Sequence, residues 1–215
     1  MSSVLLRTTL ALGLSALTAP TFAADFAACF TLTPGTTWSN GDETLSIAAA
    51  PFAGQAEALG VTTSAGGVRS TEFFDASGRR QLGKIRYGIA ALGADDSAPI
   101  MTDTYTTVPT FPATAKPGEK ITLTGKGERV NHAQDTVTPL DYEGFGDYTF
   151  VGFEDLEVEI DYQPRTFADT CHLTATFEGG RAEVWYAPGL GRIKFQRYSG
   201  DMLLIGDEIS SIDTD

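Results

Sequence analysis

Short runs of alternating apolar and polar residues dominate the chain and predict β-strands. Between Asp155 and Asp161 every odd position is acidic, and every even position, continuing to Tyr162, is apolar. A period of two places alternate side chains on opposite faces of a strand. We therefore expect a half-buried strand here, with its acidic face toward water.

Similar short runs, bounded by Gly, Asp and Ser, recur along the chain. Further strands are expected at Thr44–Ile47, Gly67–Phe74, Gln81–Tyr87, Lys120–Thr124, Tyr148–Val151, His172–Phe177, Ala182–Tyr186, Arg192–Tyr198 and Met202–Ile205. The link Asp75–Gly78 has hairpin composition, with a glycine available for positive φ. This pattern predicts a mainly β protein, an antiparallel sandwich or open half-barrel with at most one or two short helices.

Two segments depart from the strand pattern. Pro51–Leu59 is Ala-rich, begins with proline and precedes Gly60, which predicts one short helix. Pro99–Pro117 holds four prolines, which discourage a helix or a central strand. We expect residues 24–215 to form a single β-rich domain, with 99–117 as the best candidate for an internal boundary.

The first 23 residues have the composition of a secretory signal peptide. Arg7 precedes a short apolar run, and small residues lead to a cleavage site expected after Ala23. Removing 23 of 215 residues leaves 192. No later segment is long and apolar enough to be a membrane helix. The sequence therefore predicts a soluble periplasmic or secreted protein.

Cys29 and Cys171 are the only two cysteines. In an oxidising compartment such a pair most simply forms a disulfide. Alternatively, Phe26–Cys29 loosely resembles a lipobox, in which the cysteine would carry a lipid, although Asp25 precedes it where an apolar residue is expected. The sequence leaves the lipid-anchored alternative open.

Composition argues against nucleic-acid binding and against a disordered chain. The formal net charge is −13, and hydrophobic residues make up 42% of the chain. A net acidic chain without a basic cluster does not fit nucleic-acid binding, and its apolar content is too high for a disordered chain.

Few residues carry recognisable chemistry. His132 and His172 are the only histidines, and they do not form a zinc motif with the two cysteines. The acidic row from Asp155 to Asp161 lies on one strand, which cannot by itself surround a calcium ion. We therefore assign no catalytic residue, metal site or cofactor. A hydrolase assembled only by folding would draw on His132, Glu154 and Asp155.

The second half of the chain shows a resemblance. Its motifs are Pro109–Pro112, Lys116–Glu119, Tyr148–Val158, Arg165–His172 and the Trp185–Lys194 hairpin, which reads Trp-Tyr-Ala-Pro-Gly-Leu-Gly. This order resembles a group of exported bacterial β-rich proteins, distantly similar to the curved half-barrels of periplasmic lipoprotein carriers. The resemblance implies an architecture and carries over no ligand-binding residue.

These observations predict a non-enzymatic exported protein that binds an apolar or amphipathic ligand in a concave sheet, or an envelope partner. One alternative is a structural protein whose acidic sheet face contacts a basic partner, and another is the hydrolase above. The ligand-binding residues and the oligomeric state are not predicted.

Overall fold

One antiparallel sheet of 13 strands contains nearly all the regular structure that the chain shows. The structure, a computed structural model, describes residues 25–88, 95, 97–177 and 179–214. Its elements are a 3₁₀ helix η1 (Phe26–Phe30) and strands β1 (Thr36–Ser39), β2 (Glu43–Ala49), β3 (Leu59–Ala65), β4 (Val68–Phe74), β5 (Gln81–Tyr87), β6 (Pro99–Thr107), β7 (Lys120–Asn131), β8 (Thr136–Ile160), β9 (Gln163–Phe177), β10 (Gly180–Ala187), β11 (Gly191–Ser199), β12 (Met202–Glu208) and β13 (Ser211–Thr214). The mainly β, open antiparallel fold is thus confirmed, whereas the expected signal peptide lies outside the described residues.

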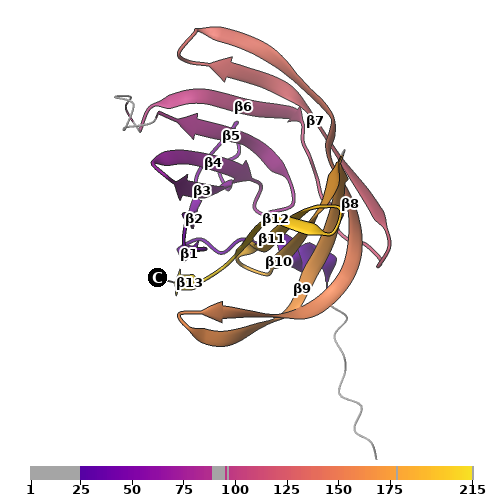
Figure 1. Cartoon of the computed structure of the whole chain (residues 1–215). Helices are drawn as coiled ribbons and strands as arrows, with labels where there is room; N and C mark the ends of the chain where they lie inside the picture. Colours follow the sequence, from indigo (N-terminus) through magenta and orange to yellow (C-terminus); the bar gives the residue numbers. More distant parts are fainter. Residues whose placement is uncertain (1–24, 89–94, 96, 178, 215) are drawn as a thin grey trace, which may run out of the picture.

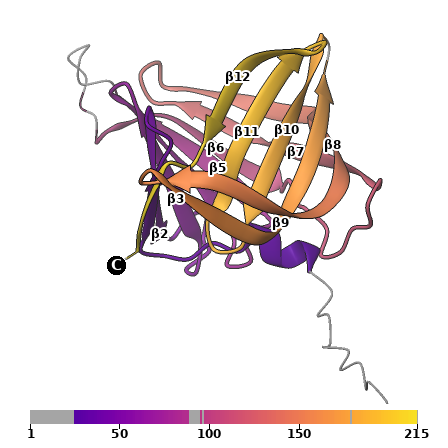
Figure 2. The ribbon, with the colours of Figure 1, turned by 60° about the horizontal axis from the view of Figure 1, so that its bottom comes forward.

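Strands β1 to β12 follow one another across the sheet in chain order. The last strand, β13, pairs with β1 instead of β12, so consecutive strands of the chain occupy the two opposite edges. The sheet remains open but is strongly curved, with β2–β7 on one side and the fan of β8–β12 on the other (Figures 1 and 2). Within the described part of the chain, no helix is long and apolar enough to span a membrane.

Strand β8 connects the two parts of the curved sheet. Its first part pairs with β7, and its second part pairs with β9. Register shifts interrupt both ladders, and such bulges increase the local bend and twist of a strand. A strand of 25 residues can therefore follow the curvature.

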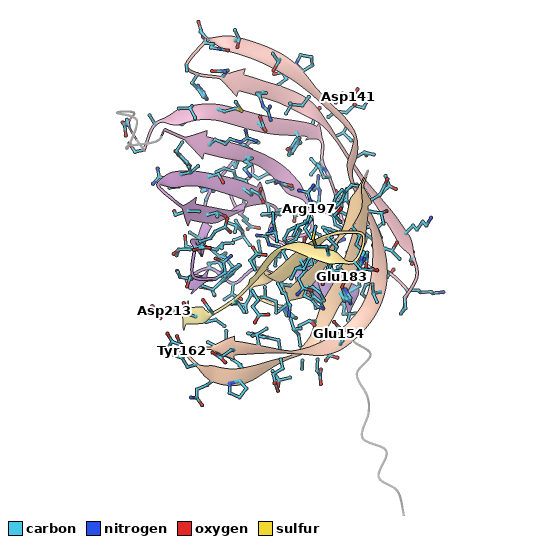
Figure 3. All side chains as sticks on the ribbon, in the orientation of Figure 1. Asp141, Glu154, Tyr162, Glu183, Arg197 and Asp213 are labelled. Atoms are coloured by element: carbon cyan, nitrogen blue, oxygen red, sulfur yellow. A yellow bond between two sulfur atoms is a disulfide. The ribbon has the colours of Figure 1, made fainter. Side chains whose placement is uncertain are left out.

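The expected acidic strand lies at the end of β8. Its carboxylates are exposed, whereas Val158 and Ile160 are buried. The assignment of Tyr162 to the buried face was wrong, because this side chain is 89% exposed at the tip of the β8–β9 hairpin (Figure 3). Asp161 and Tyr162 both have positive φ, as a two-residue type I′ turn requires, so the strand ends before Tyr162.

The helix expected at Pro51–Leu59 is absent. The segment instead turns at Ala53 and Gly54, both of positive φ, while Phe52 and Gln55 exchange backbone hydrogen bonds. The Phe52 ring stacks on Phe73 at a centroid distance of 4.1 Å. Packing of one aromatic side chain against the sheet therefore outweighs the helix propensity of the alanines.

The proline-rich segment also differs from expectation. Pro99 begins strand β6, which pairs with β5 on one side and β7 on the other. A proline is tolerated at the first position of a strand, where no preceding ladder bond is lost. The first half of the segment is thus a central strand, and the sheet continues through it. The remainder forms a loop whose Phe111 packs against a buried cluster.

Helix η1 and the disulfide close one end of the curved sheet. Cys29 of η1 is bonded to Cys171 of β9, as the sequence predicts. Both sulfurs are buried beside Phe26, Phe150 and Leu173. The sulfur that a lipid would require is therefore already in the disulfide, which disfavours the lipid-anchored alternative.

The turn between β4 and β5 requires glycine at position 78, because its backbone passes close to η1 there. Gly78 has φ +72°, and a Cβ built on it would lie 1.8 Å from the carbonyl oxygen of Phe30. The β4–β5 turn thus touches the backbone of η1 directly, which positions η1 against both halves of the sheet.

Removing the disulfide is expected to destabilise the protein. The bond spans 142 residues, so the paired Cys29→Ser and Cys171→Ser substitution restores much conformational freedom to the unfolded chain. We expect a loss of about 2–5 kcal/mol in the free energy of unfolding, measured by urea denaturation. Wild-type protein in reductant is the matched control, and equal stability of oxidised and reduced protein would contradict the expectation.

Candidate functional site

A cavity of about 610 Å³ lies on the concave face of the sheet. This volume lies within the range of small-molecule binding sites. The residues that line it come from β2–β8, β10, β11, η1 and the loops beside them. Figure 3 shows side chains filling much of the space between the two parts of the curved sheet, which leaves this cavity as the candidate site.

Aromatic side chains form one end of the cavity, here called the aromatic floor: Phe30, Phe111, Tyr148 and Tyr186. Phe30 stacks on Phe111 at a centroid distance of 4.2 Å, and Tyr186 lies 5.1 Å from Phe30. Tyr148 contacts Phe111 at 5.5 Å. The floor is therefore a connected set of rings, held in place by η1 beneath it.

Burial changes the acidity of the two floor tyrosines. The pKa of Tyr186 is raised well above its usual value because desolvation disfavours the phenolate. The pKa of Tyr148 is raised for the same reason. Both side chains are therefore neutral at physiological pH, and the floor presents apolar ring surface with hydroxyl groups.

A row of four charged side chains crosses the cavity wall, here called the charge ladder: Arg129, Asp103, Lys84 and Glu72. The sheet register places these residues directly opposite one another on β7, β6, β5 and β4. Side chains that are direct cross-strand partners lie close enough to interact. Opposite charges therefore alternate across four neighbouring strands.

The ladder contains two close ion pairs. Arg129 donates two hydrogen bonds to Asp103, from Nε to Oδ1 at 2.6 Å and from Nη2 to Oδ2 at 2.7 Å. Lys84 Nζ lies 2.9 Å from Glu72 Oε1. The Asp103 side chain is only 5% exposed, so its charge requires such a partner.

A further row lies beyond the ladder, toward the exposed end of β5. Arg86 pairs with Ser70, and Ser70 pairs with Thr63 on the next strand. All three line the cavity, and Arg86 is exposed. Successive rows are two residues apart, or about 7 Å along the strand. The cavity therefore changes from aromatic at the floor to charged and hydroxyl-bearing at the other end.

In the hairpin of β10 and β11, two adjacent aromatic residues pack in different places. Tyr186 lines the cavity, whereas Trp185 packs in a different buried cluster with Trp38 and Ile193. Gly189 and Gly191 both have positive φ. The two adjacent aromatic residues therefore pack in different places, neither is exposed, and only Tyr186 belongs to the site.

His172 belongs to a separate cluster. Its Nδ1 lies 3.4 Å from Glu154 Oε1, and its Nε2 lies 3.3 Å from Glu183 Oε2. The ring stacks on Trp185, whose indole N–H donates to Glu154. Among the residues that the structure describes, no group of three or more His, Cys, Asp or Glu is placed to hold a metal ion.

The candidate hydrolase residues do not come together. The Nε2 atom of His132 lies 2.9 Å from the hydroxyl of Thr102, next to the β7–β8 turn. Glu154 lies near the other end of β8 and contacts His172. Asp155 accepts a hydrogen bond from the backbone N–H of Asp169. Each of the three residues has its own local partner, and none of them lines the cavity.

Sequence reasoning missed the cavity residues because their strands carry polar groups on both faces. In β4, for example, Glu72 faces the cavity while its neighbour Thr71 faces the opposite side and is buried. The charged residues of adjacent strands could have indicated the cavity, but only the strand register shows that they lie next to one another on the inner face. Comparison with known proteins adds no assignment: no family model, no curated protein and no solved structure matches the chain.

The ion pair between Arg129 and the buried Asp103 is expected to stabilise the fold. Asp103→Asn keeps the shape but removes the charge opposite Arg129, so we expect a loss of roughly 1–3 kcal/mol in the free energy of unfolding. The matched control is Asp141→Asn on the exposed Lys126–Asp141 pair (Figure 3), where the loss should not exceed about 1 kcal/mol. Urea denaturation measures both, and equal losses would contradict the assignment.

The floor tyrosines predict a loss of stability at high pH. Below about pH 10 tyrosine is protonated in both the folded and the unfolded state. Above it the unfolded chain loses this proton first, because the folded-state pKa is raised, so stability falls as pH rises toward the folded-state pKa. Tyr186→Phe should reduce this alkaline loss, measured by denaturation at increasing pH.

Tyr162→Phe is the control for this measurement, because Tyr162 is almost fully exposed. It should leave the pH dependence unchanged. A Tyr186→Phe protein with the same alkaline profile as wild type would show that Tyr186 titrates alike in both states.

Proposed function

We propose that this protein is an exported, non-enzymatic binding protein that holds an amphipathic small molecule in its concave cavity. The observation that carries the proposal is the cavity itself, which brings an aromatic floor and polar rows together in one concave space. Small-molecule sites typically combine apolar and aromatic lining with a few placed polar groups. An amphipathic ligand matches this arrangement at both ends.

The electrostatic arrangement supports binding more than catalysis. The charge ladder consists of ion pairs that satisfy each other. Catalytic groups usually have a perturbed pKa in a cleft. At this cavity the pKa values of Tyr148 and Tyr186 are raised, and burial is the largest cause of both shifts.

A cavity-filling substitution tests the proposal. Val61 lines the cavity on β3, and Val61→Trp should fill part of the space. We expect it to raise the Kd for the neutral apolar fluorophore N-phenyl-1-naphthylamine by roughly tenfold or more, equivalent to about 1.4 kcal/mol. Fluorescence titration measures the Kd, and circular dichroism verifies that the variant is folded.

Val137→Trp is the matched control, because Val137 is 61% exposed and lies outside the cavity. It should bind the fluorophore like wild type. The proposal is overturned if wild-type protein does not bind the fluorophore, or if folded Val61→Trp binds it as well as wild type does.

A further inference from the structure

Basic residues outnumber acidic residues in the lining of the cavity, whereas acidic residues outnumber basic residues in the whole chain. Among the residues that the structure describes, eight charged ones line the cavity, five basic and three acidic: Arg79, Lys84, Arg86, Arg129, Arg192, Glu43, Glu72 and Asp103. The whole chain carries 15 basic and 28 acidic residues. Basic side chains are therefore concentrated at this one concave surface of an acidic protein.

Three of the five basic residues already have carboxylate partners. These are Lys84 and Arg129 in the charge ladder and Arg192, whose Nη2 lies 3.7 Å from Asp207 Oδ2 and 3.9 Å from Glu43 Oε2. The remaining two differ. Arg79 donates to the carbonyl oxygen of Phe111, and Arg86 contacts the sulfur of Met101. Neither has an ion pair with a carboxylate among the described residues.

Arg79 and Arg86 lie at opposite ends of the cavity. Arg79 lies beside the aromatic floor. Its guanidinium donates a hydrogen bond to the carbonyl oxygen of Phe111, and its backbone carbonyl accepts one from the N–H of Phe111. Arg86 lies near the far end of β5, five residues beyond Gln81, or about 17 Å along an extended strand. Arg86 is exposed, whereas Phe30 at the floor is buried. The cavity therefore presents a cation with spare donors at its open end.

Arg86 also has suitable neighbours for binding an anion. Ser70 lies directly across from it on β4, and Thr63 lies across from Ser70 on β3. A guanidinium has five N–H donors in a planar fork that fits carboxylate and phosphate. Two hydroxyl donors in the same row can complete the coordination of an anionic oxygen.

From these positions we infer that the ligand is an anionic amphiphile, a single apolar chain ending in a carboxylate or phosphate. Its head binds Arg86 at the open end, and its chain passes the charge ladder toward the aromatic floor. This inference rests on the proposed function, which requires only that the cavity binds an amphipathic molecule. It adds the sign of the head group, its position and the orientation of the chain.

A series of ligands with one chain and different heads tests the inference. Dodecanoate, dodecyl phosphate, dodecanol and dodecyltrimethylammonium, each below its micelle concentration, compete with N-phenyl-1-naphthylamine for wild-type protein. We expect one or both anionic ligands to compete best and the cation worst. The two anionic heads distinguish a fatty carboxylate from a phosphate lipid head.

Variants of Arg86 test the position of the head. Arg86→Gln should weaken binding of the preferred anion roughly tenfold and weaken dodecanol binding much less, because an alcohol head carries no charge. Arg86→Lys retains the charge and should keep much of the preference. Arg80→Gln is the matched control, because Arg80 is exposed, lies next to Arg79 and does not line the cavity.

The outcomes separate the two claims. If the fluorophore does not bind wild-type protein, the proposed function fails. If the fluorophore binds but the four heads compete equally, or the cation competes best, the anionic ligand is overturned and the proposed function stands. If the anion is preferred equally by Arg86→Gln and wild type, the assignment to Arg86 is overturned.

Discussion

The architecture depends on one constraint: strands β12 and β13, which follow each other in the chain, form the two opposite edges of the sheet. Between these strands Ile209 is fully buried, and its N–H donates to the carbonyl of Ile193 on β11. The next residue, Ser210, donates to the carbonyl of Ser39 on β1. Two residues thus join the first and last parts of the meander. A flat sheet of this width would place its edges far apart, so this connection requires strong curvature.

Curvature creates an interior that the strands must line. Strands with one face toward a packed core usually present apolar residues there. Here the inner face of β4–β7 presents the charge ladder, because the space beside it is a cavity and not a packed layer. On the opposite face Phe52 covers Phe73, and on the inner face Leu123 of β7 packs in the buried cluster at the floor end. Ion pairing between adjacent strands makes charged residues tolerable at these inward positions.

Local patterns predicted the fold class but not the site. Alternation identified the acidic end of β8, and the cysteine count identified the disulfide, since both signals are local or compositional. The missing helix at Pro51–Leu59 depends on the Phe52–Phe73 contact, which no local window contains. Likewise, Asp103 and Arg129 are unremarkable in sequence. They become an ion pair, with Asp103 buried, only through the β6–β7 register, which side-chain alternation alone does not specify.

The negative charge outside the cavity does not decide whether the cavity accepts an anionic ligand. At physiological salt, charge interactions are screened over about 8 Å, so the distant acidic surface contributes little at the cavity mouth. The acidic row from Asp155 to Asp161 lies on the β8–β9 hairpin, and its side chains are exposed. Discrimination must then come from short-range contacts with the side chains that line the cavity. A guanidinium at the open end acts within this range, whereas the proposed contact between the apolar chain of the ligand and the neutral floor carries no preference for charge.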